Sequence, residues 1–179
     1  MKIVIIGAGE VGRYVAKMLS NENHDITIMD ESEERLQDLD TNYDIMSRVG
    51  SPTSINDLQM CGVRNCDLFI AVCPSESVNT TACMIASKLG ARKTVARIDN
   101  YEYLLPKNKE MLKSIGIDKL IYPEVLAATE IVQALKRSWI REYRTFSNEA
   151  LVLVCVKVRE NSEIINKVYR QPQANRFLA

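Results

Sequence analysis

The sequence has little of what a catalytic or metal site needs, because its 179 residues include a single histidine, His24. An odd number of cysteines with no Cys-x-x-Cys pair makes a zinc site unexpected and favours reduced thiols in a cytoplasmic protein. No apolar run approaches the roughly 20 residues that a membrane-spanning helix requires. The amino terminus enters a strand directly, with no signal-peptide pattern. The cysteines are Cys61, Cys66, Cys73, Cys83 and Cys155.

The chain also lacks an excess of either charge, since Lys+Arg and Asp+Glu both number 23. A balanced charge argues against nucleic-acid binding, which depends largely on phosphate neutralisation. A local basic patch is still compatible with a neutral total, for example from 136 to 144. Hydrophobic residues make up 46% of the chain, enough for a buried core.

What the chain does have is a regular alternation of apolar runs and segments with helical spacing. The predicted strands are 2–6, 25–29, 45–49, 67–72, 94–98 and 119–122. The helices predicted between them cover 11–19, 33–39, 55–61, 78–89 and 104–115, the last two closed by Gly90 and Gly116. Parallel neighbours need crossover helices, so the pattern predicts an α/β, Rossmann-type, doubly wound parallel sheet in a domain spanning 1–122.

A long helix is predicted from Pro123 through Ile140, in a crossover segment spanning 123–144. Its apolar band, from Val125 to Ile140 and including Trp139, is wider than one sheet face requires. The helix either packs on the sheet only or also contacts a partner subunit. Both interpretations stay open at this point.

Residues 150–158 are predicted to form a strand that has no partner within the Rossmann sheet. A lone strand cannot bury itself, so we expect a chain that is cut short or borrows a partner. Residues 150–179 are interpreted as the truncated start of a small second subdomain. The tail from 170 to 179 is not expected to represent native structure.

The first candidate site is the turn Gly7-Ala8-Gly9-Glu10-Val11-Gly12, which follows a strand and precedes a helix. In this motif Gly7 permits the tight turn, Gly9 lets the backbone approach a pyrophosphate, and Gly12 lets helix and strand pack closely. The free N–H groups and positive dipole end of the helix favour phosphates. The turn predicts a dinucleotide site.

Asp30 ends the second predicted strand, 18 positions after Gly12. That spacing is close to the one expected of a carboxylate that binds the adenosine ribose. Asp30 would accept from the ribose hydroxyls and repel a 2′-phosphate. NAD or another adenosine nucleotide is therefore favoured over NADP.

Three other strand ends meet at the same edge of the sheet, where ligands of open α/β sheets bind. The segment 50–53, Gly-Ser-Pro-Thr, could wrap the adenine, and Cys73-Pro74 follows the fourth strand. Arg97 could neutralise a phosphate; the alternative is an ion pair with an acidic residue. For Cys73 the alternative is a small buried filler.

Catalysis is not expected, so the chain is interpreted as a non-enzyme. His24 precedes the second strand and so lies at the amino end of the sheet, opposite the nucleotide, where a surface histidine with satisfied hydrogen bonds is expected. No other residue is an evident acid or base for hydride transfer.

The ordered set of motifs resembles the regulator-of-conductance family of domains (RCK, or KTN). The resemblance covers about 1–143, with 151–158 similar to the first strand of the family's C-terminal subdomain. It rests on 2–12 (KIVIIGAGEVG), Asp30, 50–53, 71–79, and 96–98 before 101–103.

The resemblance implies a cytoplasmic regulatory subunit, peripheral to the inner face of the cell membrane. Such a subunit binds NAD, NADH, ATP or ADP and gates a membrane-embedded potassium transporter of the Trk type. It assembles as dimers and then rings, the helix after the sixth strand crossing to the partner. Full-length relatives carry two tandem units, so this chain is interpreted as an amino-terminal fragment.

The family's nucleotide contacts fall on residues of this chain that match its motifs. Two segments depart from the family, which usually has Gly-Asp at 50–51 and often Thr-Asp at 73–74. The residues carried over are Gly7, Ala8, Gly9, Glu10, Val11, Gly12, Asp30, Ser51, Cys73, Pro74 and Arg97.

Two other classes of protein remain as alternatives. One is the NAD-binding half of a small dehydrogenase, whose substrate domain would supply the missing acid or base. The other is a redox-responsive transcription regulator with a Rossmann core, which would need an attached helix-turn-helix that the sequence does not show.

Overall fold

A computed structural model of the chain describes residues 1–37, 39, 43–136, 140–146, 151–158, 160 and 165. The chain divides into two compact units, Met1–Ala127 and Ala128–Ala179, and each is described by itself. The strands are β1 (Lys2–Ile6), β2 (Asp25–Asp30), β3 (Ile45–Val49), β4 (Leu68–Ala71), β5 (Thr94–Arg97), β6 (Lys119–Ile121), β7 (Ile140–Phe146) and β8 (Leu151–Val156). The α-helices are α1 (Glu10–Ser20), α2 (Glu33–Leu36), α4 (Ile55–Met60), α5 (Glu76–Leu89), α6 (Pro106–Ser114) and α7 (Pro123–Lys136), with short 3₁₀ turns η1 (Val63–Asn65) and η2 (Tyr101–Leu104).

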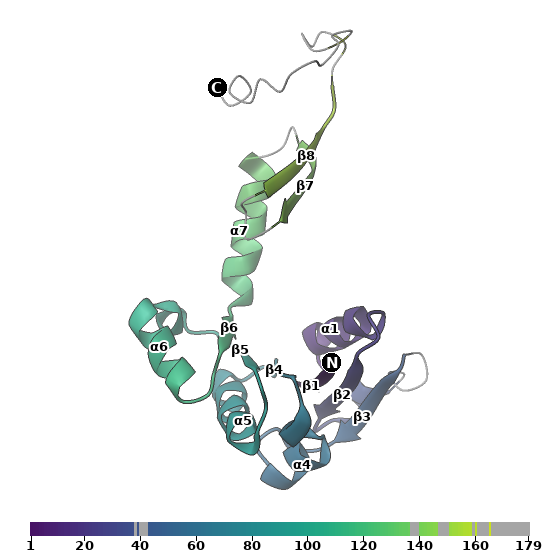
Figure 1. Ribbon diagram of the computed structural model, residues 1–179, viewed down its shortest axis with the longest axis vertical. Helices are drawn as coiled ribbons and strands as arrows, with labels where there is room; N and C mark the ends of the chain where they lie inside the picture. The colour runs from purple at the N-terminus through teal and green to yellow at the C-terminus, as the bar shows by residue number, and fades with distance from the viewer. Residues whose placement is uncertain are drawn as a thin grey trace. The chain divides into compact units, whose positions relative to one another are not determined.

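The first unit is built on a parallel sheet of six strands in the order β3-β2-β1-β4-β5-β6 (Figure 1). The chain moves outward from β1 to β3 and then returns to place β4 on the other side of β1. The predicted Rossmann-type sheet is thereby confirmed. The strand order reverses next to β1, and ligands of such sheets usually bind at the carboxyl ends of the strands beside such a reversal.

Helices cover both faces of this sheet, and β1 shows why its sequence is a continuous apolar run. Ile3 and Ile5 pack in a core that includes Ala16 of α1 and Leu36 of α2. Val4 and Ile6 face the opposite core, which α4, α5 and α6 supply. A strand buried on both faces has no polar alternation.

Two predicted helices are shorter than their apolar spacing suggests. The helix expected over 33–39 is interrupted after Leu36, because Gln37 takes an extended backbone with ψ of 146°, and Leu39 is helical again. The helix expected over 104–115 is divided into η2 and α6. Leu105 between them is extended, as a residue before proline usually is, and Pro106 begins α6. The helix predicted to end at Gly90 is confirmed, with φ of +116° at that glycine.

The prediction that a helix continues from Pro123 through Ile140 to 144 is wrong from Ile140 onward. Residues 140–146 instead form β7, which pairs antiparallel with β8. Ile140, Tyr143 and Phe146 recur every third residue, which imitates a helical period, but strand pairing decides the conformation. Trp139 lies outside the described residues.

β7 is also the partner that the sequence did not reveal for the strand predicted over 150–158. The two strands pair from Phe146 opposite Leu151 to Ile140 opposite Val156, with one irregularity between Ile140 and Glu142. The predicted lack of a partner within the six-stranded sheet is confirmed, but the inference that this is a lone strand is wrong. Its cause was the assignment of 140–144 to a helix.

Candidate functional site

The glycine turn joins β1 to α1 and presses against the end of β4. Gly7 has φ of +98°, a conformation that side chains rarely adopt, and its N–H donates to the Met29 carbonyl at 2.8 Å. A Cβ on Gly7 would lie 2.9 Å from the Cys73 nitrogen. Only glycine therefore permits this approach of the turn to both neighbouring strands.

Gly12 and Gly9 differ in what surrounds them. A Cβ on Gly12 would collide with the Gly7 carbonyl oxygen, so Gly12 is required for α1 to pack on the turn. A Cβ on Gly9 would meet no protein atom within 4 Å, and its backbone is extended. Gly9 also caps α1 without offering a side-chain acceptor to the N–H groups of the first turn. Open space and free donors are what an incoming pyrophosphate needs.

Asp30 holds the turn against the end of β2. Its Oδ2 accepts from the Ala8 N–H at 2.7 Å and its Oδ1 from the Ser32 N–H at 2.9 Å. Arg35 Nη1 lies 3.6 Å from Oδ2, and Asp30 itself is 8% exposed. A carboxylate offers about four acceptor positions, so the two N–H bonds leave positions for ribose hydroxyls. The fastening of the turn is a role of Asp30 that the sequence did not indicate.

Ser51 lies beside Asp30, after β3. The Gly50 N–H donates to the Asp30 carbonyl at 3.1 Å, which sets the start of this loop. The Ser51 N–H donates to Asp57 Oδ2 at 2.9 Å, and its hydroxyl lies 3.0 Å from Glu31 Oε1. Glu31 and Asp57 were not singled out from the sequence.

Asn79 joins the ends of β4 and β5, and it too was missed. Its Oδ1 accepts from the Cys73 N–H at 2.8 Å, and its Nδ2 donates to the carbonyls of Cys73 and Arg97 at 2.9 and 3.0 Å. Asn79 is 1% exposed. A polar residue on the buried stripe of α5 is the signal that could have identified it.

The Arg97 side chain has one acidic neighbour and one donor without a protein partner. Its Nη2 lies 3.5 Å from Asp99 Oδ1, so the ion pair considered as an alternative is present. Its Nε is buried, and no described residue accepts from it. Glu76 fixes the loop that carries Asp99, because its Oε2 accepts from the N–H groups of Asp99 and Asn100 at 2.6 and 2.7 Å. A buried N–H of this kind requires an acceptor from water or a ligand.

These contacts connect the predicted site residues into one edge of the sheet. Gly7 abuts Cys73, Asn79 links Cys73 to Arg97, Ala8 bonds to Asp30, and Ser51 follows Gly50, which bonds to Asp30. The residues are brought together; their contact with a nucleotide remains a prediction. For Glu10, Val11 and Pro74 the structure shows position only: the first turn of α1 for two of them and the β4–α5 loop for the third.

Burial keeps the cysteine thiols of this unit protonated. Burial, with smaller contributions from the nearby Asp30 and Glu31, raises the pKa of Cys73 to about 11. Burial likewise raises the pKa of Cys61 and Cys66 to about 11 and that of Cys83 to about 12. A protonated thiol at Cys73 is compatible with the small-filler alternative, and a nucleotide contact there remains a prediction.

We expect the stability of the folded unit to fall between pH 9 and about 12, in part because of Cys83. Its folded pKa lies above the ordinary thiol value of 9.0, so its contribution is complete below pH 9 and is lost as pH rises through about 12. Urea unfolding of wild type and Cys83→Ala across this range isolates the contribution of this thiol from the rest of the protein. A stability difference that is constant with pH would contradict the assignment.

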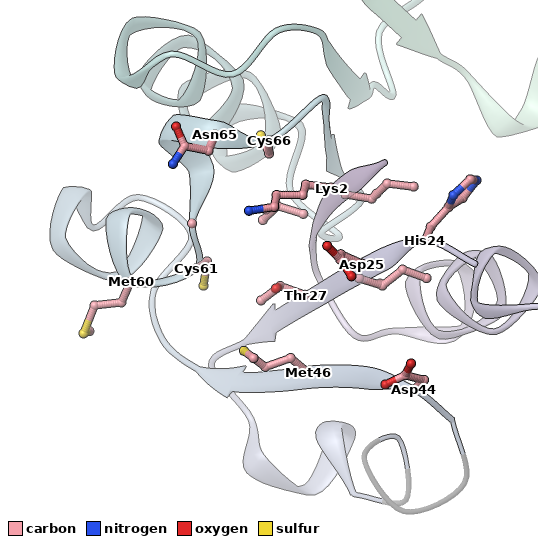
Figure 2. Close-up of a pocket in the computed structure, with 14 residues that line it drawn as sticks. Lys2, His24, Asp25, Thr27, Asp44, Met46, Met60, Cys61, Asn65 and Cys66 are labelled. Atoms are coloured by element: carbon pink, nitrogen blue, oxygen red, sulfur yellow. The ribbon is translucent and has the colours of Figure 1, made fainter. Parts of the chain in front are cut away.

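Figure 2 shows a separate cavity of about 360 Å³ at the opposite, amino-terminal ends of β1, β2 and β3. Lys2 extends toward Asn65 and Cys61, and His24 lies on the far side of the cavity. His24 is thus where the sequence placed it, away from the glycine turn. It is not the satisfied surface histidine that was expected, because its side chain is only 20% exposed and its Nδ1 has no partner among the described residues.

The described ranges hold neither a metal cluster nor a membrane span. No group of three or more His, Cys, Asp or Glu side chains there could hold a metal ion. No helix in the same part of the chain is long and apolar enough to cross a membrane.

The comparisons with known proteins identify relatives of this chain. The chain is 38% identical over 159 residues to the Trk system potassium uptake protein TrkA of Haemophilus influenzae, a match that covers 88% of this chain and 35% of that protein. The chain therefore spans about a third of the length of the relatives it matches first.

Solved structures match the fold. The TrkA-N domain of the inner membrane protein ybaL from Escherichia coli superposes with a TM-score of 0.65 at 15% identity, covering 75% of this chain and 96% of that one. The GsuK channel bound to NAD superposes with a TM-score of 0.55 at 21% identity, covering 67% of this chain and 21% of that one. Residues 3–123 match the family model of the TrkA-N domain, and the chain belongs to the TrkA-N domain family.

Proposed function

We propose that this chain is the nucleotide-sensing part of a regulatory subunit of a Trk-type potassium uptake system, and that it binds NAD(H) or, alternatively, ATP or ADP. The observation that carries the proposal is the open space at Gly9 at the N-terminus of α1, next to Ala8, whose N–H donates to the Asp30 carboxylate. Its relatives are named as potassium uptake proteins, and GsuK has been solved with NAD and with ADP.

Each site residue has a proposed part. The glycine turn and the first N–H groups of α1 hold the pyrophosphate, and Asp30 accepts from the ribose. Ser51 borders the adenosine, while Cys73 and Pro74 shape the wall between the turn and β5. Arg97 contacts a phosphate through its unpartnered Nε. No residue is assigned a catalytic role.

Regulation requires that the ligand bind two conformations with different affinities. Arg97 offers a source of that difference, because a phosphate competes with Asp99 for the guanidinium. A shift of Arg97 would reach the 99–100 loop, which Glu76 holds through two backbone N–H groups. The nucleotide is bound and released unchanged in this scheme.

The proposed partners are the membrane-embedded transporter subunit and further copies of this chain, at the cytoplasmic face of the membrane. Large apolar side chains of α7 are exposed in the single chain, among them Leu126 at 57%, Ile131 at 61% and Leu135 at 72%. Contact with a second copy would cover them and form at least a dimer. The proposed divisions are 1–122 for the nucleotide domain and 123–136 for the crossover helix, while β7, which pairs with β8, joins 150–179 in the start of a second subdomain.

Calorimetric titration with NADH, ATP and ADP tests the proposal. We expect saturable binding of at least one of them, and potassium uptake by cells carrying the full-length subunit that depends on an intact site. No binding of any of the three at millimolar concentration would refute the proposal. A substrate-dependent absorbance change of NADH would instead support the dehydrogenase alternative.

A further inference from the structure

A cavity of about 520 Å³ flanks the glycine turn on the side of α1 that faces Arg35. Cationic side chains outnumber acidic ones in its lining. The charged lining residues are Arg13, Lys17 and Arg35, with Glu10 as the one carboxylate, and the backbone of Ala8 and Gly9 completes the wall next to the turn. The cavity is therefore suited to an anion adjacent to the proposed pyrophosphate position.

Arg35 joins this cavity to the carboxylate proposed to bind the ribose. Its Nη1 lies 3.6 Å from Asp30 Oδ2, and its side chain is 53% exposed. A guanidinium has five N–H donors in a planar fork, so donors remain for a ligand. Arg13 lies alongside, since its Nη1 donates to the Arg35 carbonyl at 2.9 Å. Two guanidinium groups thus flank the ribose position.

The charge of Asp30 is already compensated in the free protein. Two backbone N–H groups and Arg35 surround its carboxylate. The sequence alone suggested that Asp30 would repel a phosphate on the ribose. Beside Arg35 and Arg13, that repulsion is offset, and an arginine next to the ribose is what accommodates a 2′-phosphate in related sheets.

We propose that this cavity is a subsite for a phosphate carried on the adenosine ribose, so that the chain accepts nicotinamide dinucleotide phosphates as well as the unphosphorylated forms. The proposal rests on nucleotide binding at the glycine turn. Arg35 binds the ribose phosphate through its fork, Arg13 supports it from α1, and Lys17 adds positive charge. The subsite makes the protein sensitive to both nicotinamide pools.

Calorimetric titrations of NADH and NADPH against wild type and Arg35→Ala test this subsite. Wild type is expected to bind NADPH at least as tightly as NADH. Arg35→Ala is expected to weaken NADPH about tenfold, as the loss of a charge-assisted phosphate contact predicts, and NADH less than about threefold. The matched control is Arg92→Ala, which removes an arginine that is 79% exposed beside Asp67 and does not line this cavity; it should change neither affinity.

A second readout is the pH dependence of the two affinities. A phosphate monoester gains a proton near pH 6, with the pKa taken as about 6, so the NADPH affinity should fall relative to that of NADH at pH 5.5. Wild type that binds NADH but binds NADPH tenfold or more weakly would overturn the subsite and leave the proposed function standing. If Arg35→Ala weakened the binding of NADH and NADPH equally, Arg35 would act only through its ion pair with Asp30. That result would also overturn the subsite. Binding of neither nucleotide would overturn the proposed function itself.

Discussion

Gly9→Ala is expected to weaken the binding of NADH, ATP and ADP by about thirtyfold, which corresponds to roughly 2 kcal/mol. The added methyl group would stand where the pyrophosphate approaches the turn. The free protein should not suffer, because a Cβ at Gly9 meets nothing within 4 Å and the backbone there is extended. A slight rise in Tm is expected, since alanine restricts the unfolded chain by about 0.4–1 kcal/mol.

Gly12→Ala is the matched control, with the opposite expectation. Its Cβ would strike the Gly7 carbonyl oxygen, so α1 would have to move from the turn. Overpacking of this kind costs about 1–3 kcal/mol, measured as a lower urea midpoint. If Gly9→Ala bound all three nucleotides normally, the pyrophosphate would not lie at this turn. If it lowered stability as Gly12→Ala does, the space at Gly9 would not be open.

Asp30→Ala is expected to lower both stability and nucleotide affinity, because the carboxylate has two tasks. Removing it leaves the N–H groups of Ala8 and Ser32 without their acceptor. Hydrogen bonds to a charged group contribute about 1.5–3 kcal/mol each, so a loss of roughly 3–5 kcal/mol of unfolding free energy is expected. Ribose recognition falls at the same time.

Asp30→Asn separates the two tasks. The amide keeps one oxygen acceptor, so it should restore part of the stability. It still lacks the negative charge that pairs with Arg35 and that is proposed to accept from the ribose hydroxyls. Chemical denaturation gives the first quantity and calorimetry at a temperature where both variants are folded gives the second. Full stability in Asp30→Ala would show that the turn does not depend on this carboxylate. Unchanged NADH affinity in a folded variant would show that the ribose does not bind at Asp30.

Most of the sheet could be predicted because its signals are local. A strand buried on both faces must be apolar throughout, as 2–6 is, and three glycines at this spacing between a strand and a helix are typical of a nucleotide-binding turn. The prediction of a helix through 140 was wrong for the same local reason. Its spacing fits a helix, and only pairing with the strand that follows it makes this segment β7.

The polar supports of the site could not be predicted, because each depends on register between distant segments. Asn79 is a site residue only because α5 brings its amide to the ends of both β4 and β5. Glu76 accepts from the backbone of a loop more than twenty positions away. Arg35 is relevant to the site only because the fold brings its guanidinium next to the Asp30 carboxylate. A sequence shows the types of these residues but not their neighbours.

Asn79 has a consequence for the thermodynamics of ligand entry. Its three hydrogen bonds fix the ends of β4 and β5 relative to one another before any nucleotide arrives. Ordering these strand ends therefore adds nothing to the entropic cost of association, which falls instead on the partly exposed Arg97 side chain and the ligand itself. Preorganisation of this kind lets a small regulatory ligand bind without the protein first having to fold its site.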